Sequence, residues 1–363
     1  MMKSVRGTKP QRTTATASRR PLPEIARRQT KMKAKKIAAL TLTALMAAAS
    51  MTGCSESGTS SGPSTGSNAG NSSQSSASTA AASADDYGLK EFVMVMIPGE
   101  DTEKSVQLRD NMAEDMSKAL GIPVTTYRAT DYSAAVEAMR TGNAQLAEFG
   151  PFSYVTARER AGAEALAVRG TKDGVSGYQS YIVVKSDSGL HTLEDLQGKT
   201  FSFVDPESTS GNVVPCNELL NAFPDLGLTF DDLHTDGKFF KSAMFAGTHP
   251  GSMQAVIQGN VDAGAVASST YENQIQAGNA KEDDLKILHE SPTIPSDPIA
   301  IQKDLPQALK DKVKEFLLSY DDADYFSDAE RIEEGKEIQR FIEANDSDYD
   351  YLQELKEKFN LSD

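Results

Sequence analysis

Cysteine occurs only twice in the 363 residues, at Cys54 and Cys216, and histidine only four times. Two cysteines cannot build a disulfide framework or a Cys-based metal cluster within one chain. The histidines show no His-x-x-x-His spacing, which is the pattern of a zinc site on a helix. The sequence therefore excludes a disulfide-rich mini-protein, gives no basis for a zinc enzyme, and leads us to expect no cofactor.

Basic residues are scarce after the first 54 positions. Residues 1–54 hold twelve Lys or Arg and one acid, whereas the other 309 residues hold 25 basic and 51 acidic side chains. A body this acidic repels nucleic-acid phosphates and anionic lipid head groups, so nucleic acid is not an expected partner. The basic segment must therefore serve a separate purpose.

The basic segment has the pattern of a secretory signal. Lys33, Lys35 and Lys36 precede a mostly apolar stretch, residues 37–49, that is too short to span a bilayer. The small residues before Cys54 resemble a bacterial lipobox. We therefore expect 1–54 to be a basic extension with a lipoprotein signal peptide, and Cys54 to be lipidated and anchored to the outside of a bacterial cell membrane. An uncleaved membrane anchor is the alternative, and Met32 is an alternative start to Met1.

Large apolar side chains are absent from residues 55–84, where 25 of the thirty residues are Ser, Thr, Gly or Ala. Such a segment cannot bury enough surface to offset the entropy lost on ordering. We expect residues 55–85 to be a flexible linker that holds the folded body roughly 30 Å from Cys54.

Strand and helix patterns alternate through the rest of the chain. The apolar run Phe92–Ile97, closed by Pro98-Gly99, predicts a strand buried on both faces. Apolar residues at every fourth position from Leu108 to Leu120 predict a helix. Further strands are expected at 124–127, 146–149, 178–185, 200–204, 239–245, 263–266 and 285–290, further helices at 131–139, 152–161, 212–222, 251–258 and 268–276, and helices alone from Pro306 onward. This alternation predicts α/β architecture, with parallel sheets flanked by helices in two units, the second inserted into the first.

The most distinctive local feature is a hydroxyl cluster at the start of a predicted helix. Ser208, Thr209 and Ser210 follow the predicted strand that ends at Val204. Free backbone N–H groups at a helix start favour an anion, and the hydroxyls add donors without adding charge. An ordinary N-cap is the alternative, because Ser and Thr are favoured there in any case. No Gly-Lys-Ser/Thr follows, so the cluster is not a nucleotide P-loop.

Four sequence blocks occur in the order seen in phosphonate-binding proteins. They are residues 147–155 (AEFGPFSYV), 205–211 (DPESTSG), 245–249 (FAGTH) and 291–299 (SPTIPSDPI). The chain thus resembles the phosphate/phosphite/phosphonate solute-binding family of ABC importers, from about Phe92 to Leu318. The resemblance implies the type II periplasmic-binding-protein fold, in which two α/β lobes joined by two crossover strands close over a ligand. We expect lobe 1 to comprise residues 86–178 plus 294–363, and lobe 2 residues 179–293.

The same resemblance implies which residues bind the ligand. They are Tyr132, Phe149, Ser208, Thr209, Ser210, His249, Ser269 and Asp297. Phe149 stands where aminophosphonate binders carry a Tyr, so that hydroxyl is missing. Ser269 falls, within about one residue, where those binders place a carboxylate for the ligand's ammonium. Both departures argue against 2-aminoethylphosphonate as the ligand.

Asp297 requires its own explanation, because a carboxylate repels a bound anion. Phosphite, phosphate and alkylphosphonates can carry a P–OH group at neutral pH and donate its proton to Asp297, whereas sulfate has no such proton. Asp297 would then act as a filter against sulfate. The alternative is an Asp-Pro turn in the loop 292–298.

Two other polar residues have competing interpretations. His249 is either a positive partner of the oxyanion or an ordinary buried histidine, and the block resemblance favours the positive partner. Cys216 lies inside a predicted helix with no histidine near it in sequence. We expect it to be a buried apolar side chain rather than a nucleophile.

These patterns predict a binding protein rather than an enzyme. We expect a lipid-anchored receptor of an ABC importer that captures phosphonate, phosphite or phosphate and delivers it to the membrane permease. A sensory receptor for the same oxyanions is the alternative with the same fold. A hydrolase that uses Ser208 or Ser210 is disfavoured, because neither serine lies in a Gly-x-Ser-x-Gly motif and no general base is recognisable.

Overall fold

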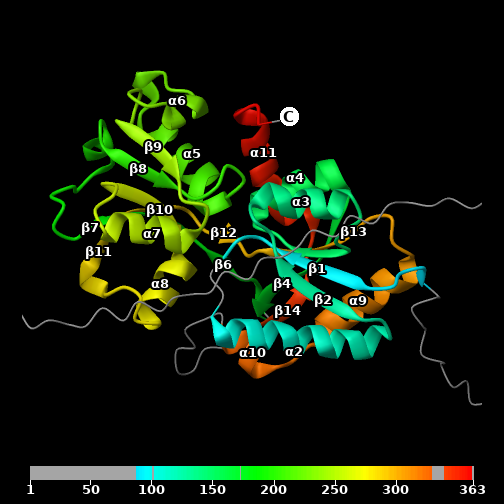
Figure 1. Ribbon diagram of the computed structural model, residues 1–363. Helices are drawn as coiled ribbons and strands as arrows, with labels where there is room; N and C mark the ends of the chain where they lie inside the picture. Colours follow the sequence, from blue (N-terminus) through cyan, green and yellow to red (C-terminus); the bar gives the residue numbers. More distant parts are fainter. Residues whose placement is uncertain (1–86, 100–101, 172, 329–338, 362–363) are drawn as a thin grey trace, which may run out of the picture. The chain divides into compact units, whose positions relative to one another are not determined.

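Two β-sheets with helices packed on them organise the described part of the chain (Figure 1). The computed structural model describes residues 87–99, 102–171, 173–328 and 339–361, which all fall in one structural unit. The predictions for the signal segment, for Cys54 and for the linker concern residues outside these ranges. Among the described helices, none combines the length and the apolar character needed to cross a bilayer.

The first sheet has the strand order β14-β4-β13-β3-β1-β2, with β5 paired to β4. Its strands are β1 (Phe92–Met96), β2 (Val124–Arg128), β3 (Leu146–Glu148), β4 (Ala163–Thr171), β5 (Gly174–Val175), β13 (Pro298–Gln302) and β14 (Arg340–Glu343). The helices of this half are α2 (Glu103–Leu120), α3 (Tyr132–Arg140), α4 (Pro151–Ala161), α9 (Gln307–Ser319), α10 (Ala323–Asp328) and α11 (Asp350–Lys358), with a 3-10 turn η5 (Asp346–Tyr349).

The second sheet has the strand order β11-β7-β10-β8-β9. Its strands are β7 (Ser180–Lys185), β8 (Thr200–Phe203), β9 (Ser242–Phe245), β10 (Ala263–Ala267) and β11 (Leu285–Glu290). The helices of this half are α5 (Val214–Ala222), α6 (Phe230–His234), α7 (His249–Ile257) and α8 (Ser268–Gln276), with 3-10 turns η1 (Leu193–Leu196), η3 (Pro224–Leu226) and η4 (Glu282–Asp284) and a π-helical turn η2 (Thr209–Val213).

The chain passes from the first sheet to the second through β6 (Gly177–Tyr178) and returns through β12 (Ile294–Pro295). These two short strands pair with each other in antiparallel fashion. Gly177 is required by their close approach, because a Cβ there would lie 2.3 Å from Cγ2 of Thr293 and 2.9 Å from the carbonyl oxygen of Ile294. A side chain at position 177 would therefore force the two connecting strands apart.

The predicted helix before Gly121 is present as α2 and starts earlier than the pattern indicated. Thr102 and Ser105 form a capping box. The Thr102 N–H donates to the Ser105 hydroxyl and the Ser105 N–H donates to the Thr102 hydroxyl, each over 3.0 Å. Gly121 ends the helix in the left-handed conformation. Met112, Met116 and Leu120 are buried, and each such side chain contributes roughly 1.5–3 kcal/mol to stability.

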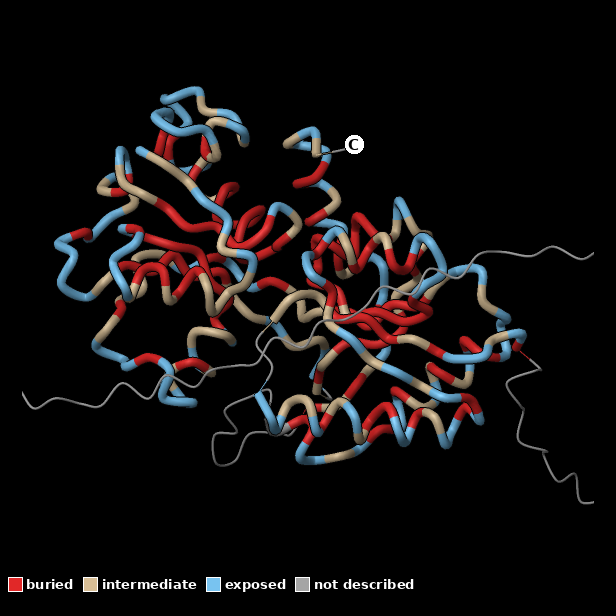
Figure 2. Tube along the Cα trace, viewed as in Figure 1, coloured by how far each residue is buried: buried red, intermediate tan, exposed pale blue. Residues whose placement is uncertain are grey.

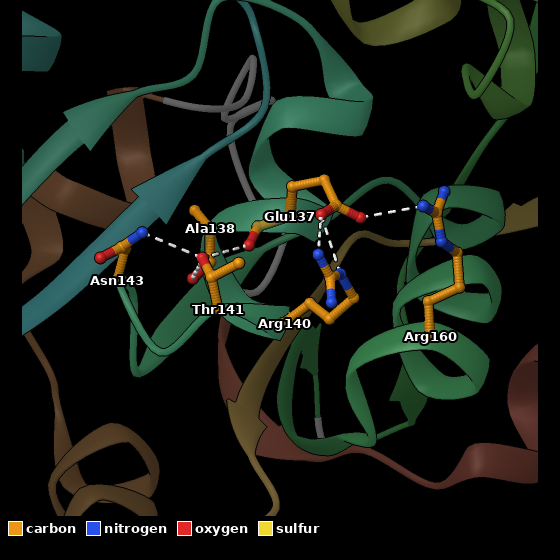
Figure 3. Close-up of polar contacts among 6 residues, drawn as sticks. All are labelled: Glu137, Ala138, Arg140, Thr141, Asn143 and Arg160. Atoms are coloured by element: carbon orange, nitrogen blue, oxygen red, sulfur yellow. Dashed lines mark hydrogen bonds and ion pairs between the residues drawn. The ribbon is translucent and has the colours of Figure 1, made fainter.

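Helices α3 and α4 are fixed to each other by one carboxylate. The Glu137 carboxylate forms ion pairs with Arg140 of its own helix (2.7 Å) and with Arg160 of α4 (2.9 Å), as Figure 3 shows. The predicted cap of α3 is confirmed, because Asp131 accepts a hydrogen bond from the Ala134 N–H (2.7 Å). The ion pairs join the last turns of α3 and α4, and the cap fixes the first turn of α3.

The apolar core lies on both faces of each sheet. The inner strands are largely buried, whereas the edge strands β2 and β9 and the outer sides of the helices are partly or fully exposed (Figure 2). In the second half, Phe201 stacks on Phe240 with ring centroids 4.5 Å apart. Cys216 is fully buried in α5, as expected.

Several expectations about strands are wrong. The sheets are mixed rather than parallel, because β13 runs antiparallel to β3 and β4, and β7 runs antiparallel to β10 and β11. The C-terminal part is not all helical, since β14 pairs with β4. Of the predicted strand 239–245, only Ser242–Phe245 forms; Phe239 and Phe240 instead bury both rings in the core beside η1 and β8.

Helix α11 connects the two halves outside their crossover strands. Its Lys358 donates hydrogen bonds to the side chains of Asn217 (2.7 Å) and Asn221 (3.3 Å) on α5. Phe359, the residue after α11, stacks on Phe230 of α6 with centroids 5.0 Å apart. On its other side, Lys356 is paired with Glu159 of α4. The end of the chain therefore bonds to both halves.

Candidate functional site

A cleft of about 1170 Å³ lies between elements of the first sheet, elements of the second sheet and the crossover strands. Helix starts line it from several sides: Tyr132 of α3, Gly150 before α4, Thr209 of η2, His249 of α7 and Ser268 of α8. Unpaired N–H groups and the positive end of the helix dipole favour an anion at such starts. The fold thus directs uncharged donors into one cleft.

The hydroxyl cluster forms one wall of this cleft, and each hydroxyl has a different environment. Ser208 Oγ caps the turn by accepting from the Gly211 N–H (3.1 Å). Thr209 Oγ1 accepts from the Phe152 N–H at the start of α4 (2.8 Å). Ser210 Oγ is buried and has no partner among the described residues. Because a hydroxyl that accepts can still donate, all three O–H groups can donate to a ligand in the cleft.

The cluster occupies a π-helical turn rather than the start of a regular helix. The Val213 N–H donates to the Ser208 carbonyl (3.1 Å), five residues back. Such turns are uncommon and occur frequently at functional sites. Gly211 permits the turn, because a Cβ there would lie 2.3 Å from Cγ2 of Val204 and 2.7 Å from Oγ of Ser208. A side chain would displace the hydroxyl that faces the cleft.

His249 is neutral, which corrects the expectation of a positive partner. Its Nδ1 accepts a hydrogen bond from the Ala267 N–H (3.1 Å), so the proton of the neutral ring is on Nε2. Nε2 lies 3.5 Å from Oγ of Ser208. Burial lowers the pKa of His249 to about 4. At neutral pH, His249 offers the cleft a single uncharged N–H donor.

Asp297 lies on the opposite wall, directly before β13. Its Oδ1 is buried and has no partner among the described residues. The pKa of Asp297 is raised to about 7: burial and the nearby negative charge of Glu148 raise it, against the smaller opposing effects of Arg169 and of a hydrogen bond with Tyr178. Asp297 can therefore hold or share a proton near neutral pH, which an exposed Asp cannot do.

Two phenols lie between these walls. Tyr132, the first residue of α3, is 2 % exposed, and burial raises its pKa while a hydrogen bond with Ser208 lowers it. Tyr178 is half-buried in β6. Burial and the charge of Asp297 raise the pKa of Tyr178, whereas the nearby hydroxyls of Ser210 and Thr209 lower it. Both phenols stay protonated at neutral pH and can donate hydrogen bonds.

Tyr178 is the residue that sequence reasoning missed. It was included only as the first residue of a predicted strand, and its neighbours in sequence give no signal of a site. It reaches Asp297 because β6 pairs with β12, which places Tyr178 opposite Ile294, three residues before Asp297. Only the pairing of the crossover strands reveals this proximity.

Not every predicted residue faces the cleft. Tyr132, Ser208, Thr209, Ser210, His249, Ser269 and Asp297 line it, whereas Phe149 is fully buried and does not. Phe149 packs instead against the core between the first sheet and α3 and α4. Ser269 is exposed at the start of α8, whose acid, Glu272, also lines the cleft.

The loop before the hydroxyl cluster contacts the first half directly. Glu207 accepts a hydrogen bond from the Thr156 hydroxyl of α4 (2.7 Å). Burial raises the pKa of Asp205, while hydrogen bonds from the backbone N–H groups of Glu207 and Tyr132 lower it. Together with the bond from Phe152 to Thr209, these contacts attach the loop to the starts of α3 and α4.

Cationic side chains of the first sheet, Arg128 of β2 and Arg169 of β4, also line the cleft. Arg128 donates to the Ile97 carbonyl (3.0 Å), and the Arg169 guanidinium lies 5.0 Å from the ring centroid of Tyr325. Within the described ranges, no three His, Cys, Asp or Glu side chains gather as ligands of a metal ion would.

Comparison with known families and proteins gives a consistent result. The family model described as "ABC transporter, phosphonate, periplasmic substrate-binding protein" matches residues 94–349. The phosphonates-binding periplasmic protein of Escherichia coli is 32% identical over 211 residues, which are 57% of this chain and 59% of that protein. The chain thus matches less than two thirds of that relative's length. The phosphate-import protein PhnD of Mycolicibacterium smegmatis is 33% identical over 61% of this chain and 69% of its own length.

Solved structures share the fold. The binding-protein component of an ABC phosphonate transporter from Pseudomonas aeruginosa superposes with a TM-score of 0.64 at 24% identity, over 74% of this chain and 86% of that chain. PhnD1 from Prochlorococcus marinus, solved in complex with methylphosphonate, gives a TM-score of 0.62 at 24% identity, over 75% of this chain and 98% of that chain. The fold is therefore that of the type II periplasmic binding proteins.

Proposed function

Because this chain belongs to the family of periplasmic substrate-binding proteins of phosphonate ABC transporters, we propose that it captures a small phosphorus oxyanion in the cleft and delivers it to the membrane permease. The observation that carries the proposal is the pairing of two opposite walls. Uncharged donors from Ser208, Thr209, Ser210 and His249 form one wall. Asp297, with a buried oxygen that has no partner in the described part of the chain, forms the other.

We assign the ligand oxygens to these walls by their chemistry. A phosphorus oxyanion has several oxygens that accept hydrogen bonds, and hydroxyl and N–H donors at a helix start can bind them without a net positive charge. Tyr132 and Tyr178 add two phenol donors between the walls. Asp297 then accepts the remaining proton of the ligand, or donates its own, so that the complex holds one proton between two oxygens.

The proton between Asp297 and the ligand gives selectivity. Sulfate is fully ionised at neutral pH and brings no proton, so its oxygen would face the ionised form of Asp297 or require Asp297 to take up a proton. Because the pKa of Asp297 is about 7, its ionised form, which repels sulfate, predominates above that pH, and the discrimination against sulfate should weaken as the pH falls below 7. The site should therefore favour an anion that still carries a P–OH group.

The two sheets support a division of the chain into two binding lobes. We assign residues 86–178 plus 294–363 to lobe 1 and residues 179–293 to lobe 2, with β6 and β12 as the crossover between them. Ligand contacts come from both lobes, so binding would favour the closed arrangement of the two, and the closed form would be the one the permease recognises.

Within the ligand class we favour phosphite or a short alkylphosphonate. The relatives carry names that specify phosphonates, phosphate and phosphite, so the names alone do not choose among them. Ser269 offers no carboxylate to an ammonium group, and Glu272, one turn further along α8, is exposed. We therefore expect 2-aminoethylphosphonate to bind more weakly than methylphosphonate or phosphite.

A ligand panel tests the proposal. Thermal-shift and calorimetric titrations of the protein from Asp85 onward would use phosphite, methylphosphonate, phosphate, 2-aminoethylphosphonate and sulfate. Saturable binding of at least one phosphorus oxyanion, with sulfate much weaker, is the expected result. Binding of none of them, or sulfate as the preferred ligand, would overturn the proposal, and preference for 2-aminoethylphosphonate would overturn the assignment of Ser269.

Membrane attachment through Cys54 is part of the proposal and rests on the lipobox-like sequence alone. The full chain should incorporate a labelled fatty acid in a bacterial host and fractionate with membranes. Cys54→Ser should lose the label and appear in the soluble extracytoplasmic fraction. A Cys54→Ser protein that stayed in the membrane would instead support an uncleaved anchor.

A further inference from the structure

Asn212 lies within the π-helical turn that carries the ligand hydroxyls, yet its own side chain faces away from the cleft lining. The residue is 1 % exposed. Its Nδ2 donates a hydrogen bond to the Pro206 carbonyl (2.8 Å). This bond joins the two ends of the segment 206–212 and closes the loop around Ser208, Thr209 and Ser210.

His234, the last residue of α6, contacts the amide oxygen of Asn212. Its Nε2 lies 2.7 Å from Oδ1 of Asn212. The Pro206 carbonyl can only accept, which fixes Nδ2 toward Pro206 and Oδ1 toward His234. A proton on Nε2 of His234 can then be donated to Asn212 over 2.7 Å, the shorter of the ring's two contacts with carbonyl oxygens, the other being that of Nδ1 with the Phe230 carbonyl (3.0 Å). The hydrogen bonds run in one direction, from α6 to Asn212 and from Asn212 to the loop.

The His234 ring is itself held firmly. Phe203, Phe230 and Phe245 surround it, with centroid distances of 4.5, 4.8 and 5.4 Å. Its Nδ1 lies 3.0 Å from the Phe230 carbonyl. The ring has little freedom to move away from Asn212, so it can serve as a fixed support.

The competing explanation is that Asn212 and His234 only fill space in the core. The other hydrogen bonds of the loop show what else holds it in place. Ser208 is held by its cap with Gly211, Thr209 by the Phe152 N–H, and the Ser210 carbonyl by the Ser180 hydroxyl (2.6 Å). The Pro206 carbonyl, at the other end of the loop, is held by Asn212. Cys216 also approaches Oδ1 of Asn212, at 3.6 Å, as a weak S–H donor. Its sulfur also lies 3.7 Å from Nε2 of His234. Cys216→Ala therefore removes buried volume and weak sulfur contacts next to Asn212 but leaves both hydrogen bonds of the Asn212 amide in place, so it provides a control for packing.

We propose that Asn212 and His234 are positioning residues, which fix the loop so that the hydroxyls of Ser208, Thr209 and Ser210 point at the ligand. Neither residue contacts the ligand. The proposal rests on the proposed function of this loop, and it adds that ligand affinity depends on a hydrogen-bond chain that begins at α6, outside the cleft.

Two substitutions of Asn212 test the chain of bonds. Asn212→Ala removes both bonds, and Asn212→Asp keeps the size and the acceptor for His234 but loses the donor to Pro206. Each should weaken methylphosphonate or phosphite binding by about tenfold, the effect of one buried hydrogen bond, mainly through faster dissociation in stopped-flow. Cys216→Ala should lower the melting temperature and leave affinity within twofold of wild type.

His234 is tested by rescue. His234→Leu should weaken binding as Asn212→Ala does, and His234→Gln, whose side-chain amide can still donate to Asn212, should recover most of the affinity. If His234→Gln bound no better than His234→Leu, the role of His234 as a donor would be wrong. Equal losses for Cys216→Ala and Asn212→Ala, or wild-type affinity for Asn212→Ala and Asn212→Asp, would overturn the proposal as a whole.

A measurement without ligand separates this proposal from the proposed function. Amide hydrogen exchange of residues 208–211 should be faster in Asn212→Ala than in wild type and unchanged in Cys216→Ala. If wild type bound no phosphorus oxyanion, the proposed function would fail, while the exchange rates would still decide whether Asn212 holds the loop. Unchanged exchange in Asn212→Ala would overturn the positioning role.

Discussion

The backbone N–H of Ala267, the last residue of β10, donates a hydrogen bond to Nδ1 of His249, the first residue of α7, over 3.1 Å. This bond determines which ring nitrogen faces the cleft with a proton. It also adds to the cost of charging the ring, because a protonated Nδ1 would have to turn away from the Ala267 N–H. The two observations explain how a histidine in an anion site can stay neutral.

The first prediction concerns the stability of the ligand-free protein at acidic pH. The pKa of His249 is about 4 in the folded chain and about 6.5 when unfolded. Between these values the unfolded chain binds more protons than the folded chain, so stability should fall as the pH is lowered from 6.5 to 4. Melting temperatures measured across this range should fall less steeply for His249→Gln. An equal slope in both proteins would contradict the neutral assignment.

The second prediction concerns discrimination against sulfate. Asp297→Asn removes the negative charge that faces a fully ionised ligand, and the amide can donate to it. Sulfate binding relative to phosphite should rise by at least about tenfold. Competition calorimetry of the two anions gives this ratio directly, and a ratio equal to that of wild type would argue that Asp297 only stabilises its turn.

The third prediction concerns the hydrogen bond between Tyr178 and Asp297. This bond lowers the pKa of Asp297, so Tyr178→Phe should raise it. Because the folded-state pKa of Asp297, about 7, lies above that of an unfolded Asp, ionisation of Asp297 reduces stability as the pH rises from about 4 to 7. In Tyr178→Phe this decline should extend to higher pH. Thermal unfolding from pH 4 to 9 tests the shift, with Asp297→Asn as the variant that lacks the decline.

The fourth prediction concerns Gly211. Gly211→Ala places a Cβ against Val204 and Ser208 and should destabilise the protein and weaken ligand binding, because the backbone of the π-helical turn must move. Gly150→Ala is the matched control in the same cleft, since its Cβ would meet Oγ1 of Thr209 at 3.5 Å, an ordinary contact. A Gly211→Ala protein with the melting temperature and affinity of Gly150→Ala would show that the turn tolerates a side chain.

Local patterns in the sequence were sufficient to predict many elements of the fold. The strand at Phe92 and the helix ending at Gly121 have strong apolar periodicity and clear caps, and both are present. Strand β4 escaped detection because its sequence, AEALAVRGT, is rich in alanine and lacks a regular alternation. It is a strand because β13 and β14 pair with its two edges, and such long-range pairing has no local signature.

The candidate site was predicted unevenly for the same reason. The hydroxyl cluster is contiguous, so residues 208–210 could be identified from one segment. Tyr178 and Asp297 are distant in sequence and meet only through the pairing of β6 and β12. Phe149 was selected by position in a block, but its strand points the ring into the core. The neutral state of His249 depends on a bond from β10, which no sequence pattern specifies.

The contacts of α11 have a practical consequence for anyone who handles this protein. Lys358 is hydrogen-bonded to α5 and Phe359 stacks on α6, while Lys356 is paired with α4. Helix α11 therefore joins the two halves outside the crossover strands. A truncation that removes α11 would remove these contacts and should alter the movement of the proposed lobes. A bulky protein fused after α11 would disturb the same contacts. Affinity tags and dyes are therefore better attached ahead of Asp85 than at the carboxyl end.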